Sequence, residues 1–547
     1  MDTLLEFANA KRLTLLLVKE RAKCLRSNGS DKKKRKRLNR ECDIDNLPKR
    51  KMLSRIMPPR YTWVRPSKRV KQKDGSMNHR KNAEKAILLT IDHDKNSPKR
   101  KKTPQYQKEL DDFIDRIKER LSAEQLSFES PQLIPILKST KQTPKGPMVV
   151  TCRPLSVYSK LEDKIIIALT TRYLTRILDR HLHKNILSYR PPRRFYGKEH
   201  HVTDFNDGIT LIEEFRKNHE HEDIFVSDCD IKKFYDTIPH NVVIECFERI
   251  LQKTKLNEDG KAQVMRVIKA YLNSYNFYSN AWLNAELHPQ VFAKVRRRLR
   301  DKQYKNCYKL SLADEIWALS KKARMQRGVP QGGALSQIIA NVVLNDVDQV
   351  ITSKKDDNRL FLRFCDDMIL MHTSRNECTL LMKAYTESLK NHGLYYHDFE
   401  QVANTKVLTT PNKTSKHFWD IKSHSTFKWG DGEGDSNRYI GFLGYEMQRD
   451  GKLRIRKSNI QRIKEKINSM YYALSRYQSN EEKTEEEKIE HTEKAIKYLM
   501  NRFNVYTALD QERFRRGWQY RVVIDLKDQL VEKLSQQKAL NESQQGK

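Results

Sequence analysis

The sequence of 547 residues predicts an α+β fold. Two apolar runs, residues 360–362 and 368–371, flank a short acidic turn, which is typical of a strand, a tight turn and a second strand. A third apolar run, from Ile224 to Val226, also leads into an acidic segment. Several longer segments instead repeat apolar residues with the period of a helix. A chain of this length is expected to form about two to four compact units.

The helical segments follow one another along the chain. Helical periodicity begins near residue 106, with one apolar face running from Leu110 to Leu121. Four prolines between residues 131 and 147 predict an irregular stretch. Further helices are expected over residues 161–187 and 335–350. Residues 455–547 are dominated by helical periodicity, and their acidic patch is interpreted as a solvated helix face or as a surface that docks onto a basic region elsewhere.

The charge of the chain points to a polyanionic partner. The net charge is +36, from 106 Lys and Arg against 70 Asp and Glu. Residues 1–100 hold 29 Lys and Arg against 11 Asp and Glu, and their densest basic run is residues 32–37. This balance favours nucleic acid as the partner. The segment is either a flexible, solvated arm or an RNA-binding extension that orders on its partner.

Cysteine usage and hydropathy indicate the cellular compartment in which the protein is expected. Eight cysteines are scattered without a Cys-x-x-Cys pair, which favours reduced thiols over a disulfide framework or a zinc ribbon. The pairs His181/His183 and His200/His201 lack partners at ligand spacing and are interpreted as surface or phosphate-facing residues and not as metal ligands. No apolar run reaches the roughly 20 residues that span a bilayer. We therefore expect a cytoplasmic protein without a membrane partner, although the run at 32–37 also mimics a nuclear-localisation signal.

Carboxylates mark both of the predicted acidic segments. Asp366 and Asp367 lie at the bend between two apolar runs, and Asp230 closes the strand that begins near Ile224. An isolated Asp-Asp pair is most often a solvated turn. Strand-borne carboxylates from two separate segments can, however, hold two Mg²⁺ ions that activate a 3′-hydroxyl and stabilise a leaving pyrophosphate.

A glycine-rich block lies between the carboxylates in sequence. Residues 328–341 read GVPQGGALSQIIAN. The two adjacent glycines predict a turn at which the backbone can approach a nucleotide closely, directly before the apolar helix. A lone Gly-Gly pair is weak evidence for a nucleotide-binding turn. The whole run of residues 328–341 is much stronger evidence for one.

In this order and spacing, the three blocks resemble the palm of a reverse transcriptase, and the nearest likeness is to bacterial group-II-intron-like enzymes. The likeness covers residues 150–450. It implies a right-hand polymerase with fingers, an antiparallel-sheet palm and a helical thumb. It also implies RNA-directed DNA synthesis from dNTPs with two Mg²⁺ ions, or with Mn²⁺. Ser336-Gln337 departs from the usual Ser-Pro and matches relatives that build diversity-generating elements.

The resemblance implies roles for individual residues. Asp230, Asp366 and Asp367 would be the catalytic residues and, together with Ile231, the metal-binding ones. Tyr235 would lie beneath the sugar and reject a 2′-hydroxyl. The implied nucleotide-binding residues are Arg153, Lys164, Ile231, Tyr235, Gln331, Gly332 and Lys406, and the implied primer grip is Phe442, Leu443, Gly444 and Tyr445.

Two further aspartates and one further block have weaker assignments. Asp228 shares the strand with Asp230 and competes with it as a metal ligand, but lacks the pattern that follows Asp230. Asp236 is expected to cap the helix that runs from Pro239 to Leu251. Ser188 to Pro191 resembles the second fingers block without its usual Gly-Phe.

The predicted organisation has three parts. Residues 1–105 form a basic N-terminal extension, residues 106–450 the fingers and palm, and residues 451–547 the helical thumb and C-terminal region. Residues 252–325 exceed the usual spacing between palm blocks and are interpreted as an insertion. Its aromatic and basic residues suit either stacking on single-stranded nucleic acid or a subunit interface. The aromatic residues are Tyr271, Tyr275, Phe277, Tyr278 and Trp282.

The resemblance leaves the biological role open. The expected partners are an RNA template, in the first place a non-coding RNA, the DNA product, dNTPs, and a second copy or a partner protein. The basic extension, the insertion and the helical tail are most like defence-associated, abortive-infection reverse transcriptases. The alternatives are an enzyme of a group II intron, a retron or a diversity-generating element, untemplated or protein-primed synthesis, and a non-catalytic RNA-binding scaffold. The intact carboxylates oppose the scaffold.

Overall fold

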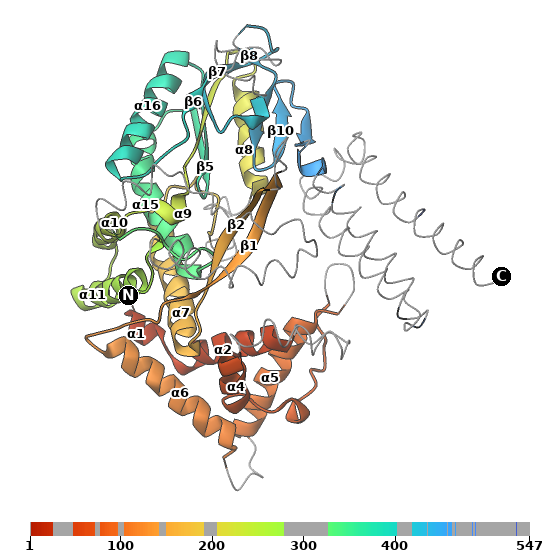
Figure 1. The fold of residues 1–547 in the computed structure, drawn as a ribbon, viewed down its shortest axis with the longest axis vertical. Helices are drawn as coiled ribbons and strands as arrows, with labels where there is room; N and C mark the ends of the chain where they lie inside the picture. Colours follow the sequence, from red (N-terminus) through yellow and green to blue (C-terminus); the bar gives the residue numbers. More distant parts are fainter. Residues whose placement is uncertain are drawn as a thin grey trace, which may run out of the picture. The chain divides into compact units, whose positions relative to one another are not determined.

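The computed structural model describes residues 2–25, 47–71, 77–96, 103–141, 149–190, 205–277, 326–401, 418–434, 436–456 and 458–461, with the single residues 465, 484, 487 and 532. Helices and strands both occur, so the α+β prediction is confirmed (Figure 1). The chain divides into two compact units. Unit 1 comprises residues 1–201, 230–354 and 383–397, and unit 2 comprises residues 202–229, 355–382 and 398–547.

The N-terminal part of unit 1 is helical where it is described. Helix α2 contacts α4, α5, α6 and α7, and its apolar run places Leu13 and Leu17 in the core. Helix α6 confirms the helix predicted from residue 106, with the expected apolar face buried. The basic run at 32–37 lies outside the described residues. The helices are α1 (Leu4–Phe7), α2 (Ala10–Leu25), α4 (Leu47–Arg55), α5 (His79–Asn96), α6 (Gln105–Ser122) and α7 (Leu161–Leu178).

Helix α7 is shorter than predicted. The periodicity favoured a helix over residues 161–187, but a 3₁₀ turn at Asp179–His181 replaces its continuation. Asp179 holds the guanidinium of Arg190 through both its carboxylate and its carbonyl group. The same carbonyl oxygen accepts from the Leu182 amide at 3.2 Å, which closes the 3₁₀ turn. No Gly or Pro between 179 and 187 marks this helix end in the sequence.

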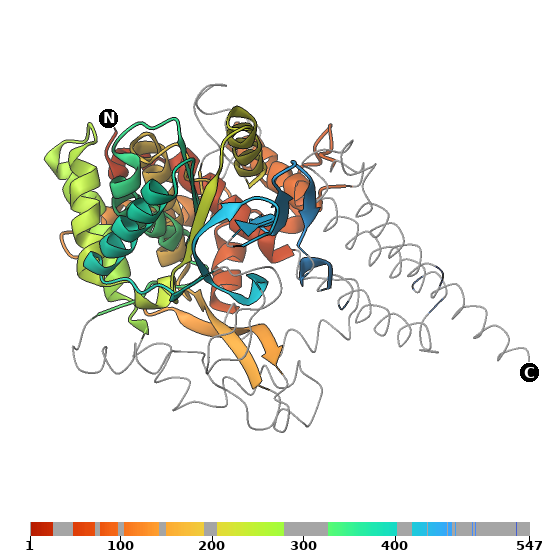
Figure 2. The ribbon, with the colours of Figure 1, turned by 90° about the horizontal axis from the view of Figure 1, so that it is seen from above.

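Where the structure describes it, the proline-rich stretch is not irregular, so the prediction is wrong around Pro135, while Pro144 and Pro147 lie outside the described residues. Strands β1 (Gln132–Lys141) and β2 (Val149–Val157) form a two-stranded antiparallel ribbon (Figure 2). Pro135 is the register partner of Pro154. Both strands of a two-stranded ribbon are edges, where a residue without an N–H group is tolerated.

The remainder of unit 1 is built around helix α15 (Ala334–Thr352). This helix confirms the apolar helix predicted over 335–350, and α7 and α10 (His240–Gln252) pack against it. Helix α11 (Glu258–Asn273) packs against α10 and α7. The short helix α9 (Phe234–Thr237) precedes α10.

Unit 2 contains the main sheet, with strands in the order β4-β5-β3-β7-β6 and β8 paired with β7. The expected strands are present, and β4 with β5 and β3 with β7 pair antiparallel. The two-residue strands β6 and β8 instead pair parallel with β7. The bounds are β3 (Phe225–Asp230), β4 (Arg359–Phe364), β5 (Asp367–His372), β6 (Phe399–Glu400), β7 (Ser423–Trp429) and β8 (Ser436–Asn437).

Two helices and a second, smaller sheet complete the described elements. They are α8 (Phe205–Asn218), α16 (Arg375–Asn391), β9 (Tyr439–Phe442), β10 (Tyr445–Gln448) and β11 (Leu453–Ile455). The predicted thumb and residues 278–325 of the predicted insertion lie almost entirely outside the described residues. Within the described residues, no helix has the length and apolar character needed to cross a membrane.

Candidate active site

The paired aspartates lie at a strained turn. Phe364 and Asp367 are register partners, so Cys365 and Asp366 form a two-residue connection between β4 and β5. Cys365 has φ +58°, a left-handed conformation that side chains other than glycine rarely adopt. The buried guanidinium of Arg363 donates to the Cys365 carbonyl oxygen at 3.0 Å. A fixed cation donor therefore holds the turn that carries both carboxylates.

Strand β3 brings the third carboxylate to the same sheet. β3 ends at Asp230 and is the neighbour of β5, which begins at Asp367. The Asp230 carbonyl oxygen accepts from the His397 amide at 3.0 Å, and the next residue, Ile231, is buried and bridges to Tyr396. The backbone on both sides of the carboxylate-bearing Cα is therefore anchored.

Asp228, the competing carboxylate, has a structural partner. Its Oδ1 accepts from the His424 amide at 2.9 Å and lies 2.8 Å from His424 Nδ1. Burial alone would lower the pKa of His424, but the Asp228 carboxylate outweighs it and raises that pKa. Asp228 thus joins β3 to β7 through a partly buried ion pair, which leaves Asp230 as the candidate ligand on this strand.

The Asp236 side chain does not cap helix α10, so that prediction is wrong. The N-cap of α10 is Pro239, without a side-chain bond, and Asp236 lies within the preceding helix α9. The Asp236 carboxylate instead accepts from Gln331 Nε2 at 2.5 Å. The buried Asp236 therefore orients the glutamine that was predicted to contact the nucleotide.

Both glycines after Gln331 are required by close packing. Gly332 has φ +80°, and a Cβ there would lie 2.2 Å from Leu155 Cδ1. A Cβ on Gly333 would lie 2.2 Å from Tyr271 Oη. The Ser156 amide donates to the Gln331 carbonyl oxygen at 2.9 Å. The turn is thus held between β2 and α11.

A buried hydroxyl network supports this turn, and the sequence reasoning missed it. Ser336 Oγ donates to the Pro330 carbonyl oxygen at 2.7 Å and lies 2.8 Å from Tyr271 Oη. Tyr158 stacks on Tyr271 at 5.9 Å. The prediction that Tyr271, Tyr275 and Phe277 offer a stacking surface is wrong because all three side chains are fully buried in the core.

Tyr235 lies in the same neighbourhood. It is half-buried in α9, and its ring meets that of Phe234 edge-on at 5.3 Å. Its carbonyl oxygen accepts from the Val329 amide at 2.8 Å. The first palm block and the glycine block are therefore joined through the backbone of Tyr235 as well as through Asp236.

The basic residues that were predicted to bind the nucleotide differ in their surroundings. Lys164 forms an ion pair with Glu20 at 2.5 Å. Burial would raise the pKa of Glu20, but Lys164 and Lys23 outweigh it and lower that pKa. Arg153 lies in β2, opposite Ile136, with its side chain outside the described residues, as is the whole of Lys406.

In the second fingers block, Arg190 has a structural position. Its guanidinium is buried against Asp179 and donates to the His183 carbonyl oxygen at 2.8 Å. The adjacent Tyr189 is 40% exposed and left-handed, with φ +56°. The structure therefore places this arginine in the core.

The predicted primer-grip hairpin is present in unit 2. Phe442 and Tyr445 are register partners at the ends of β9 and β10, and both side chains are buried. Leu443 and Gly444 form the turn, with φ +52° and +87°. Two consecutive positive φ values are typical of a type I′ hairpin turn, in which a leucine is unfavourable.

Backbone strain concentrates in the motif blocks. Among the described residues, the non-glycine residues with positive φ are Tyr189, Lys233, Cys365 and Leu443. Each lies in a block that was identified from sequence. Left-handed conformations of such residues cost about 1–3 kcal/mol each and are commonest at functional sites.

One family model matches the part of the chain that contains these motif blocks. Residues 140–399 match the family model described as reverse transcriptase (RNA-dependent DNA polymerase), whereas no curated protein matches. Among solved structures, the chain is similar to apo telomerase from Candida tropicalis, truncated from its C-terminal domain, at 13% identity and a TM-score of 0.33, over 60% of this chain and 55% of that one. It is also similar to telomerase from Candida albicans in complex with a TWJ fragment of telomeric RNA, at 13% identity and a TM-score of 0.30, over 84% of this chain and 73% of that one.

The chain thus spans little more than half the length of the first telomerase structure. The family match runs from β1 to β6 and includes all three palm blocks. With it, the predicted right-hand polymerase fold is confirmed. Residues 140–399, slightly less than half of the chain, thus match a reverse transcriptase domain.

Proposed function

We propose that this protein copies an RNA template into DNA by adding dNTPs to a 3′-hydroxyl. One observation carries the proposal: within the reverse transcriptase domain, β3 ends at Asp230 and its neighbour β5 begins at Asp367, directly after Asp366. Carboxylates on neighbouring strands concentrate negative charge that a protein without bound cations would have no reason to maintain.

The donor set suits two Mg²⁺ ions. Asp230, Asp366 and Asp367 offer hard carboxylate oxygens, which Mg²⁺ prefers, and Ile231 would contribute through its backbone. Mn²⁺ accepts the same donors. When bound, the ions would favour ionisation of the 3′-hydroxyl and stabilise the leaving pyrophosphate. The Cys365 turn would keep the carboxylates fixed, so that little reorganisation accompanies the reaction.

The other residues would bind and orient the substrate. Gln331, aimed by Asp236, and Gly332 would contact the incoming nucleotide. Arg153 and Lys164 would hold the triphosphate, and Lys164 would have to exchange Glu20 for it. Lys406 would protonate the pyrophosphate. Phe442, Leu443, Gly444 and Tyr445 would hold the primer end.

The choice between dNTPs and rNTPs directly tests whether Tyr235 lies beneath the sugar of the bound nucleotide. We expect Tyr235→Ala to use rNTPs far more efficiently, because removing the ring removes the steric block to the 2′-hydroxyl. The ratio of kcat/KM for dNTP and rNTP should fall at least tenfold, measured by single-nucleotide primer extension. Tyr235→Phe is the matched control, since it keeps the ring and should keep the discrimination. An unchanged ratio in Tyr235→Ala would show that another residue selects the sugar.

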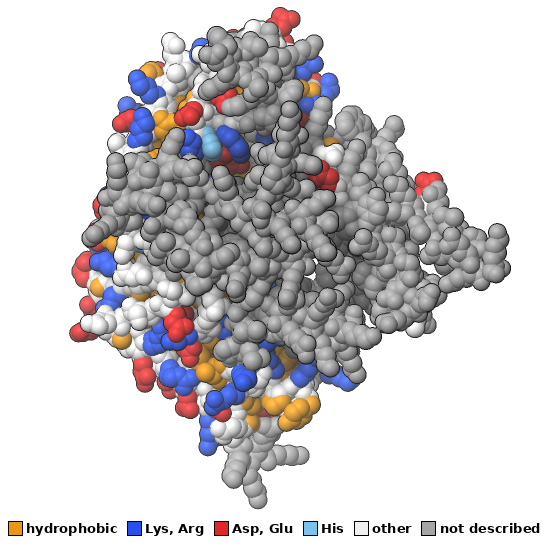
Figure 3. Space-filling model, viewed as in Figure 1, with side chains coloured by type: hydrophobic (Ala, Val, Ile, Leu, Met, Phe, Trp, Pro, Cys, Tyr) orange, Lys and Arg blue, Asp and Glu red, His pale blue; other side chains and the backbone are white. Residues whose placement is uncertain are grey.

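The RNA partner is proposed from charge. Figure 3 shows Lys and Arg side chains among scattered acidic ones at the lower end of the view, where the N-terminal helices of unit 1 lie in Figure 1. Deleting residues 1–50 would not isolate the contribution of charge, because Leu13 and Leu17 belong to the core. Substitution of the basic run at 32–37 avoids this difficulty.

We expect replacement of the six basic residues at 32–37 by serine to weaken RNA binding and flatten its salt dependence. Each lost phosphate contact should reduce the slope of log K against log salt by roughly one unit. The measurement is filter binding over a range of salt. Lys355→Ser, an exposed lysine in unit 2, is the control and should leave the slope unchanged. Equal slopes in the wild-type protein, the 32–37 variant and Lys355→Ser would show that the RNA contacts lie outside residues 32–37.

For the biological role, we propose antiphage defence together with a non-coding RNA, in a bacterial, group-II-intron-like enzyme. The proposal is supported by the basic N-terminal segment, in which half of the net charge lies. RNA that copurifies with the protein from native cells should be one abundant species. Primer extension on that RNA, with and without template, separates templated from untemplated synthesis.

A further inference from the structure

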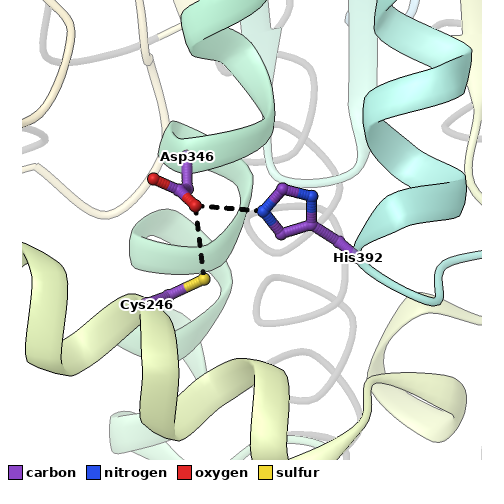
Figure 4. A group of neighbouring side chains, drawn as sticks. All are labelled: Cys246, Asp346 and His392. Carbon is purple, nitrogen blue, oxygen red and sulfur yellow. Dashed lines mark hydrogen bonds and ion pairs between the residues drawn. The ribbon is translucent and has the colours of Figure 1, made fainter.

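Three side chains that the polymerase site does not use point toward one another in unit 1 (Figure 4). They are Cys246 on α10, Asp346 on α15 and His392, directly after α16. Their ligand atoms all lie within 4.8 Å of one another. Asp346 Oδ2 lies 3.7 Å from Cys246 Sγ and 3.0 Å from His392 Nε2. We refer to these three residues as the Cys246 cluster.

The hydrogen bonding of His392 orients Nε2 toward the Asp346 carboxylate, as a shared cation would require. Nδ1 lies 2.7 Å from the Ser388 carbonyl oxygen, which can only accept, so Nδ1 carries a proton. In a neutral imidazole, the lone pair of Nε2 then faces the Asp346 carboxylate at 3.0 Å. Two lone pairs at this distance repel unless a proton or a metal ion lies between them. A backbone carbonyl on Nδ1 is also the common arrangement around metal-bound histidine.

Entry of a metal ion would displace the thiol proton of Cys246, because the thiolate is the form that binds metal.

We propose that Cys246, Asp346 and His392 bind one zinc-like divalent transition-metal ion. Thiolate, imidazole and carboxylate are the ligand types that zinc takes, at about 2.0–2.3 Å each. Such bond lengths put the ligand atoms of a tetrahedral site about 3.3–3.8 Å apart. The two separations from Asp346 Oδ2, 3.7 and 3.0 Å, lie close to this range, and the third, between Cys246 Sγ and His392 Nε2, is at most 4.8 Å. Water would take the fourth position.

Arg249 is the internal competitor for this site. Its Nη2 donates to Asp346 Oδ2 at 2.7 Å and to Cys246 Sγ at 3.3 Å. The side chain is 49% exposed, so it can turn into solvent when the metal ion enters. Because its charge opposes that of the ion, its removal should strengthen metal binding.

Metal binding would hold three helices together. The Cys246 cluster joins α10, α15 and the end of α16. Asp346 is twelve residues beyond Ala334, so the ion would lie about 18 Å along α15 from the glycine turn. The proposed ion therefore stabilises the helices that support the glycine turn and takes no part in the chemistry.

Cobalt binding tests the proposal. After treatment of the full-length protein with a chelator, one equivalent of Co²⁺ should produce a near-ultraviolet thiolate-to-cobalt absorption band, and Zn²⁺ should displace it. Cys246→Ser should remove the band. Cys378→Ser is the matched control and should retain it, since Cys378 is an equally buried thiol that contacts the Phe225 carbonyl group outside the cluster.

Absence of the band in the wild-type protein, or its persistence in Cys246→Ser, would overturn the proposal. If Cys246→Ser does not fold, Arg249→Gln tests the proposal in its place. Arg249 is half-exposed, so the protein should tolerate its replacement. We expect that variant to bind Co²⁺ about tenfold more tightly, within the range that neighbouring groups exert on metal affinity. Unchanged affinity in Arg249→Gln would contradict a metal ion in the Cys246 cluster.

Discussion

Combining Asp366→Asn with Asp367→Asn is expected to abolish dNTP incorporation, with a loss of at least about 100- to 1,000-fold in rate. Amides cannot supply the negative charge that two divalent ions require, whereas the β4–β5 turn is compatible with asparagine at both positions. Nucleic-acid binding should be nearly unchanged because these residues are proposed to act on the metal ions. Primer extension and filter binding on the same preparations measure the two properties.

The matched control for this double variant is Asp357→Asn. Asp357 is an exposed acidic residue just before β4, paired only loosely with Lys355 at 3.4 Å. We expect it to incorporate dNTPs at the wild-type rate. Full incorporation by the Asp366/Asp367 double variant would contradict the assignment of the polymerase site to this turn.

Arg190→Ala is expected to lower the free energy of unfolding of the protein by about 3–5 kcal/mol. The side chains of Arg190 and Asp179 are 0% and 2% exposed, so truncating the arginine leaves a buried carboxylate without its cation. The two backbone carbonyl groups that the guanidinium reaches, those of Asp179 and His183, also lose a donor. Urea denaturation followed by circular dichroism measures the change.

Arg180→Ala provides the comparison, because Arg180 is an exposed arginine in the same segment. Its removal should change the free energy of unfolding by no more than about 0.5 kcal/mol. If Arg190 instead held the triphosphate, Arg190→Ala would keep its stability and raise KM for dNTPs. That result would contradict the structural role given to Arg190 here.

The local elements of the reverse transcriptase domain could be predicted from the sequence. The β4–β5 hairpin, the end of β3, helix α15 and the hairpin at 442–445 all depend on neighbours within a few residues. Apolar periodicity and turn residues record such contacts directly. The prediction failed at Pro135 and Pro154, because a proline signals a broken strand unless the strand is an edge.

The sequence by itself thus determined the α+β class, the palm blocks and the family of the domain. Only the tertiary structure decided which polar side chains are paired: Asp228 with His424, Asp236 with Gln331, and Cys246 with Asp346. These partners are 196, 95 and 100 residues apart. Local propensity carries no record of such pairs, because burial and hydrogen bonding between distant segments exist only after the chain has folded.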